Sequence, residues 1–182
     1  FHALVGHACR NAMPNEYPQW QDISWERLDY PIIPQSWITK PREDRSQGKM
    51  LRDLKAKLDH CDAIICATDS DAEGYGIYYL VCDFLKLRNM PTLRFIEHSL
   101  TDKEILHSLL TMTDLYQDPV HRCFMGSYLI RSRADWLYGL NLTMLMSTIT
   151  GTKKTVGRVK APTIKLVYDR CNEIDHFVKK TY

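Results

Sequence analysis

The chain has 182 residues, of which 45% are hydrophobic and 25% are charged. This balance is typical of a soluble globular protein and excludes a disordered tail or a collagen-like chain. No apolar run approaches the roughly 18 to 20 residues that span a bilayer, and the start has no signal-peptide pattern. We therefore expect a cytoplasmic protein with no membrane partner. A first residue of Phe1 instead of methionine suggests a piece of a longer chain.

Charge is distributed unevenly along the sequence, although the formal net charge is only +2. Residues 1–115 carry 13 basic and 17 acidic residues, a net charge of −4. Residues 116–182 carry 11 basic and 5 acidic residues, a net charge of +6. The basic C-terminal third is compatible with a polyanionic partner, but a solvated basic surface would have the same composition.

The N-terminal part predicts irregular and extended chain. Five prolines between residues 11 and 48 exclude a long helix there. Residues 30–37 have two prolines in an apolar context, which indicates an extended segment lying over a surface. Three tryptophans are expected to anchor this part: Trp20, Trp25 and Trp37.

The middle of the chain alternates between helix and strand patterns. Apolar residues at helical spacing predict helices over 49–60, 75–87 and 101–112. A short apolar run predicts a strand over 62–68 that is buried on both faces, and 92–98 predicts a second strand. This alternation predicts an α/β fold with parallel strands and right-handed crossovers.

The last third predicts long helices over 118–150 and 159–177, separated by a basic loop. The second helix carries an apolar stripe of Ile164, Val167, Cys171 and Ile174. The C-terminal third is therefore expected to be mainly helical.

Three carboxylates stand at alternate positions after the first predicted strand: Asp69, Asp71 and Glu73. Ligand sites in α/β sheets form beyond the carboxyl ends of strands. Carboxylates gathered there repel each other, and Mg²⁺, which prefers oxygen ligands, relieves that repulsion. An acidic turn that caps the following helix explains the pattern equally well. Phosphatases with a D-x-D-G motif are excluded, because Ala72 and Glu73 follow the second Asp.

Four segments resemble the motifs of one protein family, and along the chain they follow the order that they have in that family. Residues 131–143 (RSRADWLYGLNLT) resemble the R-x-R-A-D-W-L-x-G-x-N-x-T/S signature of type IA DNA topoisomerases, especially the topoisomerase III branch. Residues 156–163 (VGRVKAPT) are similar to its G-R-V-Q-T-P-T motif, and 169–177 to its following helix. Residues 67–74 (ATDSDAEG) resemble A-T-D-P-D-R-E-G. The resemblance covers nearly the whole chain.

The resemblance implies a fold and an activity. Type IA enzymes cut one DNA strand, hold it through a tyrosyl-phosphate bond, pass another strand and reseal. Residues 1–115 would be a Toprim domain with a Rossmann-like sheet whose first strand is missing. Residues 116–182 would be part of the helical domain that binds single-stranded DNA. Mg²⁺ would bind Asp69, Asp71 and Glu73, and no nucleotide cofactor is expected. The parent protein would act on DNA in the bacterial cytoplasm, at the nucleoid.

The same resemblance places four DNA-binding residues in the basic third: Arg131, Arg133, Arg158 and Lys160. Arginine forks suit phosphate oxygens. Because residues i and i+2 do not share a helix face, we expect one of Arg131 and Arg133 to contact DNA. The other is expected to pair with Asp135 or another acid.

The departures from the family pattern bear on activity. The family has Arg, an acid and Gln where this sequence has Ala72, Tyr75 and Lys160. No residue here matches the nucleophilic Tyr or the first Toprim Glu, so the chain alone is expected not to relax supercoiled DNA. A non-catalytic DNA-binding homologue is the alternative function. A Toprim nuclease or primase is disfavoured, because those proteins lack the helical domain with the G-R-V motif.

Overall fold

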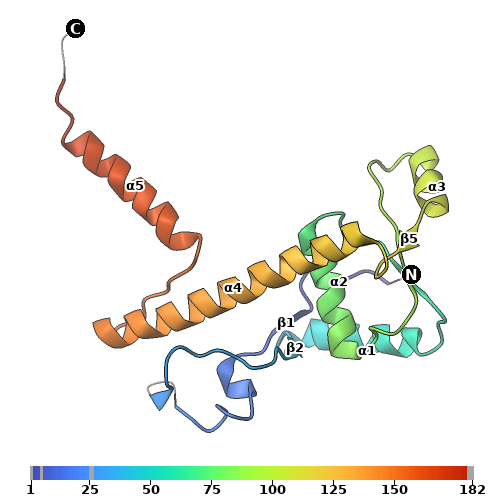
Figure 1. Ribbon diagram of the computed structural model, residues 1–182, viewed down its shortest axis with the longest axis horizontal. Coiled ribbons are helices and arrows are strands. Elements are labelled where there is room, and N and C mark those ends of the chain that lie inside the picture. Colours follow the sequence, from blue (N-terminus) through green and yellow to red (C-terminus); the bar gives the residue numbers. More distant parts are fainter. Residues whose placement is uncertain (1, 5, 25–26, 180–182) are drawn as a thin grey trace.

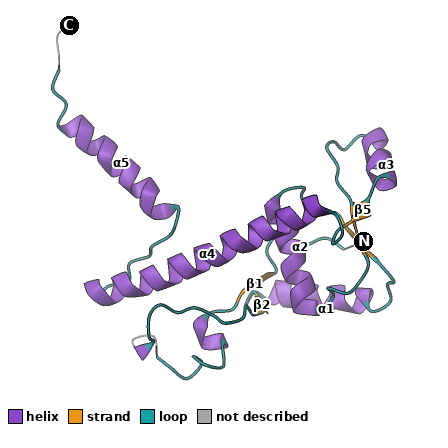
Figure 2. Cartoon of the chain, in the orientation of Figure 1, coloured by secondary structure: helices purple, strands orange, loops and turns teal. Residues whose placement is uncertain are grey.

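The computed structural model describes residues 2–4, 6–24 and 27–179. The fold is mixed α/β, with small sheets near the N-terminal two thirds and long helices in the last third (Figure 2). This arrangement confirms the fold class that the sequence predicted. Within the described ranges, no helix combines the length and the apolar character needed to cross a membrane.

A three-stranded sheet has the order β3-β4-β5. β3 (Ile64–Cys66) and β4 (Thr92–Arg94) are parallel, and β5 (Thr113–Asp114) pairs with β4 in the antiparallel direction. The connection from β3 to β4 contains α2 (Ala72–Leu85), and α3 (Asp102–Leu110) lies between β4 and β5. The predicted parallel pair with a helical crossover is therefore confirmed.

One expectation about this sheet is wrong. The strand predicted over 62–68 covers only Ile64–Cys66, and it is buried on one face only. Cys66 is buried in the core, whereas Ile65 is 54% exposed and its register partner Leu93 is 38% exposed. The core packs against one side of the sheet, so the apolar run does not reflect burial on both faces.

The N-terminal part contains two strands that the sequence did not predict. β1 (Cys9–Asn11) and β2 (Thr39–Pro41) form an antiparallel ribbon with Cys9 opposite Pro41. A short 3₁₀ helix, η1 (Pro14–Glu16), follows β1, and α1 (Arg45–Leu58) begins four residues before the predicted helix.

The tryptophans of this part have partial burial. Trp20 and Trp37 are half-buried, and Trp25 lies outside the described residues. The Trp37 ring meets the Trp136 ring edge-on, with centroids 5.4 Å apart. Trp136 also donates from Nε1 to the Ala12 carbonyl at 3.0 Å. These contacts join the N-terminal part to the long helix of the last third.

That long helix is α4 (Pro119–Thr150), which spans 32 residues. The Asp118 side chain caps its start by accepting from the Val120 N–H, and it ends at Gly151, where φ is +65°. Its first half crosses α2 so closely that Gly76 faces the Tyr128 ring directly. Figure 1 shows the second half of α4 extending beyond the α/β body.

The final helix, α5 (Lys160–Asp175), has no buried residue. The predicted helix is confirmed, but the apolar stripe is exposed, with Ile164 57%, Val167 59% and Ile174 59% accessible. Figure 1 shows that α5 points away from the body, and this explains why its apolar positions are not covered.

Candidate nucleic-acid interface

The segment that carries Asp69, Asp71 and Glu73, here called the acidic loop, joins β3 to α2 and folds back on the start of that helix. Asp71 is the N-cap of α2, and its Oδ1 accepts from the Gly74 N–H at 2.8 Å. A Cβ on Gly74 would lie 2.2 Å from the Asp69 carbonyl oxygen, so only glycine allows this close approach. The capping interpretation of the sequence pattern is thus confirmed for Asp71.

A buried arginine, Arg94 of β4, holds the backbone of the acidic loop by hydrogen bonds. Its guanidinium donates to the carbonyl oxygens of Cys66 at 2.8 Å, Thr68 at 2.6 Å and Asp69 at 2.8 Å. It also lies 4.5 Å from the centre of the Tyr75 ring. Only 1% of Arg94 is exposed. Sequence reasoning missed this residue, although a charged side chain inside an apolar strand was the available signal.

The acidic loop does not form a ready-made metal centre. In the described part of the chain, no three Asp, Glu, His or Cys side chains lie close enough to hold one ion. Asp69 and Asp71 are exposed oxygen donors at the end of β3, which suits a hard cation. Glu73 instead pairs with His7 Nε2 at 2.9 Å and with the Arg131 guanidinium. As it lies here, Glu73 is engaged by His7 and Arg131 and does not complete a three-carboxylate set.

The two arginines of the long-helix motif point to different neighbours, as their spacing predicted. Arg131 pairs with Glu73 across the α2–α4 contact and lies 5.8 Å from the Tyr128 ring centre. Arg133 lies 5.2 Å from the Trp37 ring centre. Arg131 is therefore the one that pairs with an acid.

Asp135 pairs with a third arginine, Arg158, and the acid that pairs with Arg131 is Glu73. The Asp135 Oδ1 accepts from Arg158 Nε at 2.5 Å, and this ion pair joins α4 to the loop before α5. The pair raises the pKa of Arg158, mainly through the hydrogen bond to Asp135. Lys160, the first residue of α5, is exposed and contacts the Thr155 hydroxyl.

Two of the four predicted DNA-binding residues share a cavity of about 620 Å³ between the β1–β2 ribbon and α4. We call this cavity the arginine groove. Its charged lining consists of Arg10, Arg42, Glu73, Arg131, Asp135 and Arg158, and His7 also lines it. Tyr128 and Trp136 supply aromatic surface, and Arg133 and Lys160 do not line it. Four cationic guanidiniums converge there against two carboxylates, which favours an anionic ligand.

Two further groove residues, Cys9 and Tyr128, have ionisable side chains. Burial raises the pKa of the Cys9 thiol to about 12, so this cysteine stays protonated at neutral pH. Burial also raises the pKa of Tyr128. The arrangement can bind and orient an anion, and burial keeps Cys9 and Tyr128 in their neutral forms.

Known proteins resemble this chain along almost its whole length. A family model described as DNA topoisomerase matches residues 121–182. DNA topoisomerase 3 of Vibrio cholerae is 33% identical, and the match covers 98% of this chain and 28% of that protein. DNA topoisomerase 3 of Staphylococcus saprophyticus is 36% identical, with 98% and 24% covered, and that of Salmonella typhimurium is 33% identical, with 98% and 28% covered. The chain thus spans about a quarter of the length of these relatives.

Proposed function

Since this chain belongs to the topoisomerase III-like branch of the type IA DNA topoisomerases, we propose that it binds a single DNA strand in the arginine groove. The parent protein would cut, pass and reseal single strands through a tyrosyl-phosphate intermediate. The observation that carries the proposal is the convergence of Arg131 and Arg158 in one groove next to the acidic loop. Residues 1–115 would act as the Toprim domain and 116–182 as part of the helical domain.

The groove chemistry suits phosphates on a single strand. Arg131 and Arg158 are held by Glu73 and Asp135 in half-exposed ion pairs. Such pairs contribute little stability, so a phosphate can replace each carboxylate as the partner of the guanidinium. Unpaired bases can also stack on aromatic side chains. The bases of a duplex are not available for such stacking. Arg133 and Lys160 would contact the strand outside the groove.

Asp69 and Asp71 are the side chains that would hold Mg²⁺. A bound Mg²⁺ would screen the charge of a nearby phosphodiester and bind its oxygens. Gly74 and Arg94 keep the loop backbone in place, so the two carboxylates stay at the end of β3. Glu73 would join the set only after it leaves His7 and Arg131. A phosphate that binds Arg131 would remove one of these two partners of Glu73 and leave the contact with His7.

Fluorescence anisotropy with a labelled single strand of about 15 nucleotides tests the proposed function. We expect binding that falls between about 50 and 200 mM salt and prefers the single strand to duplex. Arg158→Ala should weaken binding about fivefold at 0.1 M salt and reduce the salt slope by about 0.7, the value of one phosphate contact. The matched control is Arg170→Ala, because Arg170 forms an exposed ion pair with Glu173 away from the groove. Equal binding of duplex and single strand, with no effect of Arg158→Ala, would contradict the proposal.

Calorimetric titration with MgCl₂ tests the metal assignment. Asp69→Asn should weaken Mg²⁺ binding about tenfold, because affinity follows the charge of the oxygen ligands. Glu73→Gln should change it much less in the absence of DNA, since Glu73 is engaged by His7 and Arg131. Mg²⁺ affinity that ignores Asp69→Asn would show that the loop is only a helix cap.

A non-catalytic DNA-binding homologue remains the second candidate. The capping role of Asp71 and the ion pairs of Glu73 favour it, together with Ala72 and Tyr75 at positions that differ from the family. The reading frame that encodes this chain separates the two candidates. A downstream sequence with the family's nucleophilic Tyr motif supports the enzyme, whereas its loss supports the binding protein.

A further inference from the structure

We infer that the β1–β2 ribbon forms the second wall of the strand-binding groove, and that Arg42 binds a phosphate there. The assignment rests on the proposed function and extends it to a part of the chain outside the family motifs. Arg42 follows β2 directly and lines the arginine groove opposite the residues of α4.

The backbone fixes the position of Arg42. Its N–H donates to the Ala8 carbonyl at 2.9 Å, which continues the ladder in which Cys9 pairs with Pro41. Burial raises the pKa of Tyr128 on α4, and the charge of Arg42 partly offsets this rise. Arg42 therefore faces across the groove from the ribbon.

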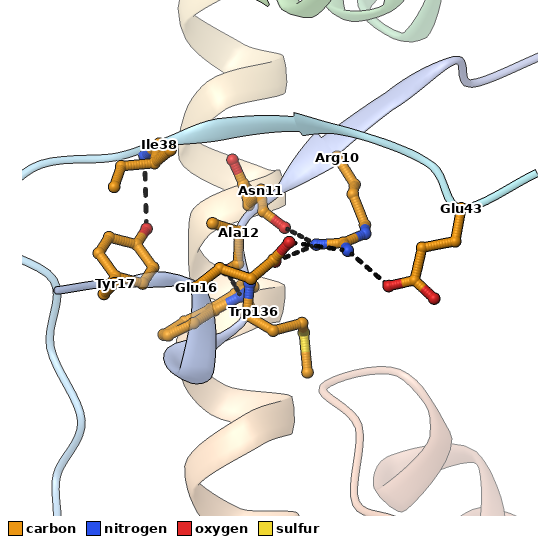
Figure 3. A network of polar contacts seen from close by, with 9 residues as sticks. Arg10, Asn11, Ala12, Glu16, Tyr17, Ile38, Glu43 and Trp136 are labelled. Atoms are coloured by element: carbon orange, nitrogen blue, oxygen red, sulfur yellow. Dashed lines mark hydrogen bonds and ion pairs between the residues drawn. The ribbon is translucent and has the colours of Figure 1, made fainter. Parts of the chain in front are cut away.

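The ion pairs of the groove single out Arg42. Arg10 is held by Glu16 at 2.6 Å and by Glu43 at 3.2 Å (Figure 3). Arg131 and Arg158 are held by carboxylates as well. The Arg42 side chain, in contrast, forms neither a hydrogen bond nor an ion pair with the backbone and side chains that the structure describes. It is thus the groove cation that can bind a phosphate without first losing a carboxylate.

Arg10 has a different role in the same wall. Its guanidinium contacts the Asn11 carbonyl as well as the two glutamates, and Figure 3 shows these contacts joining the ribbon to η1 and to the chain after β2. Glu16 in turn accepts from the Met13 N–H at 2.7 Å. This network makes Arg10 a support of the ribbon, and we assign the phosphate contact to Arg42 alone.

Salt-dependent anisotropy with the same single strand and the full 182-residue chain tests this assignment. Arg42→Ala should lower the affinity about fivefold at 0.1 M salt and the salt slope by about 0.7, as expected for one phosphate contact. Arg42→Lys should keep the slope, because it keeps the charge. Arg122→Ala is the matched control: Arg122 is exposed on α4 and does not line the groove, so removing it changes the net charge equally.

The outcomes separate this assignment from the proposed function. A loss of affinity in Arg42→Ala but not in Arg122→Ala supports the assignment. If Arg158→Ala weakens binding while Arg42→Ala behaves like the control, strand binding in the arginine groove is supported and the role of Arg42 is overturned. If the wild-type chain shows no salt-sensitive binding, the proposed function fails, and this assignment fails with it. Circular dichroism of each variant should match the wild type, because Arg42 is exposed.

Discussion

Replacement of Gly76 by Ala should destabilise the protein by about 3 kcal/mol, the upper range for overpacking of a core. A Cβ at this position would lie 2.2 Å from the Cγ and Cδ2 atoms of Tyr128. These atoms belong to the base of a buried ring, which cannot move aside without shifting α4 against α2. Because Tyr128 also lines the arginine groove, the shift should weaken DNA binding too. Urea unfolding followed by circular dichroism measures the loss.

Gly126→Ala is the control for this prediction. Gly126 lies in α4, and a Cβ there would meet nothing within 4 Å. In a helix interior, this change should raise stability by about 0.5–1 kcal/mol. Similar unfolding free energies for the two variants would show that the α2–α4 contact is loose enough to absorb a methyl group.

Replacement of Arg94 by Met should cost about 3 kcal/mol, because the partly buried carbonyls of Thr68 and Asp69 lose their donor and the Cys66 carbonyl keeps only the Phe95 N–H. The methionine retains part of the apolar contact with the Tyr75 ring, so the loss reflects mainly the missing hydrogen bonds. The acidic loop should also become more mobile, and backbone amide hydrogen exchange of residues 68–74 should accelerate.

Arg88→Met controls for the loss of an arginine that lies on a tyrosine. Arg88 is 4.6 Å from the Tyr79 ring centre and pairs with Asp83 at 2.7 Å, but its side chain is 50% exposed. Its loss should cost less than about 1 kcal/mol. If the two variants unfold at the same urea concentration, Arg94 does not support the loop in the way described.

Local patterns were sufficient to predict most helices. α2, α3, α4 and α5 lie within a few residues of their predicted ranges, and Thr101 caps α3 by accepting from the Glu104 N–H. Helices are predictable because their apolar spacing and caps are local in sequence. The parallel β3–β4 pair was also predictable, since a helical crossover favours that direction.

Features that depend on distant contacts were not predictable. β1 and β2 have three residues each, which is too short for a periodic signal, and residues 12–38 separate them in the sequence. The exposure of Ile65 depends on what covers the sheet, and an apolar run carries no such information. Apart from the parallel β3–β4 pair, prediction from sequence therefore succeeded within segments and failed for the contacts between them.

In the candidate site, too, residues in motifs could be predicted, whereas their partners could not. Arg131 and Arg158 were identified through their motifs, and both line the groove. Their partners Glu73 and Asp135 lie 58 and 23 positions away along the chain, so the ion pairs follow only from the fold. Arg42 has no motif, and its place in the groove depends on the register of the β1–β2 ribbon.

The length of α4 has a mechanical consequence. Its 32 residues make a rod of about 48 Å at the usual rise per residue. Tyr128 packs on α2 near one end of this helix, and the distance from there to Thr150 is about 33 Å. A tilt of α4 by about 5° at Tyr128 would move its far end by about 3 Å, which is the length of a hydrogen bond. The packing at Gly76 and the contacts of Trp136 therefore together set where the loop that carries Arg158 lies.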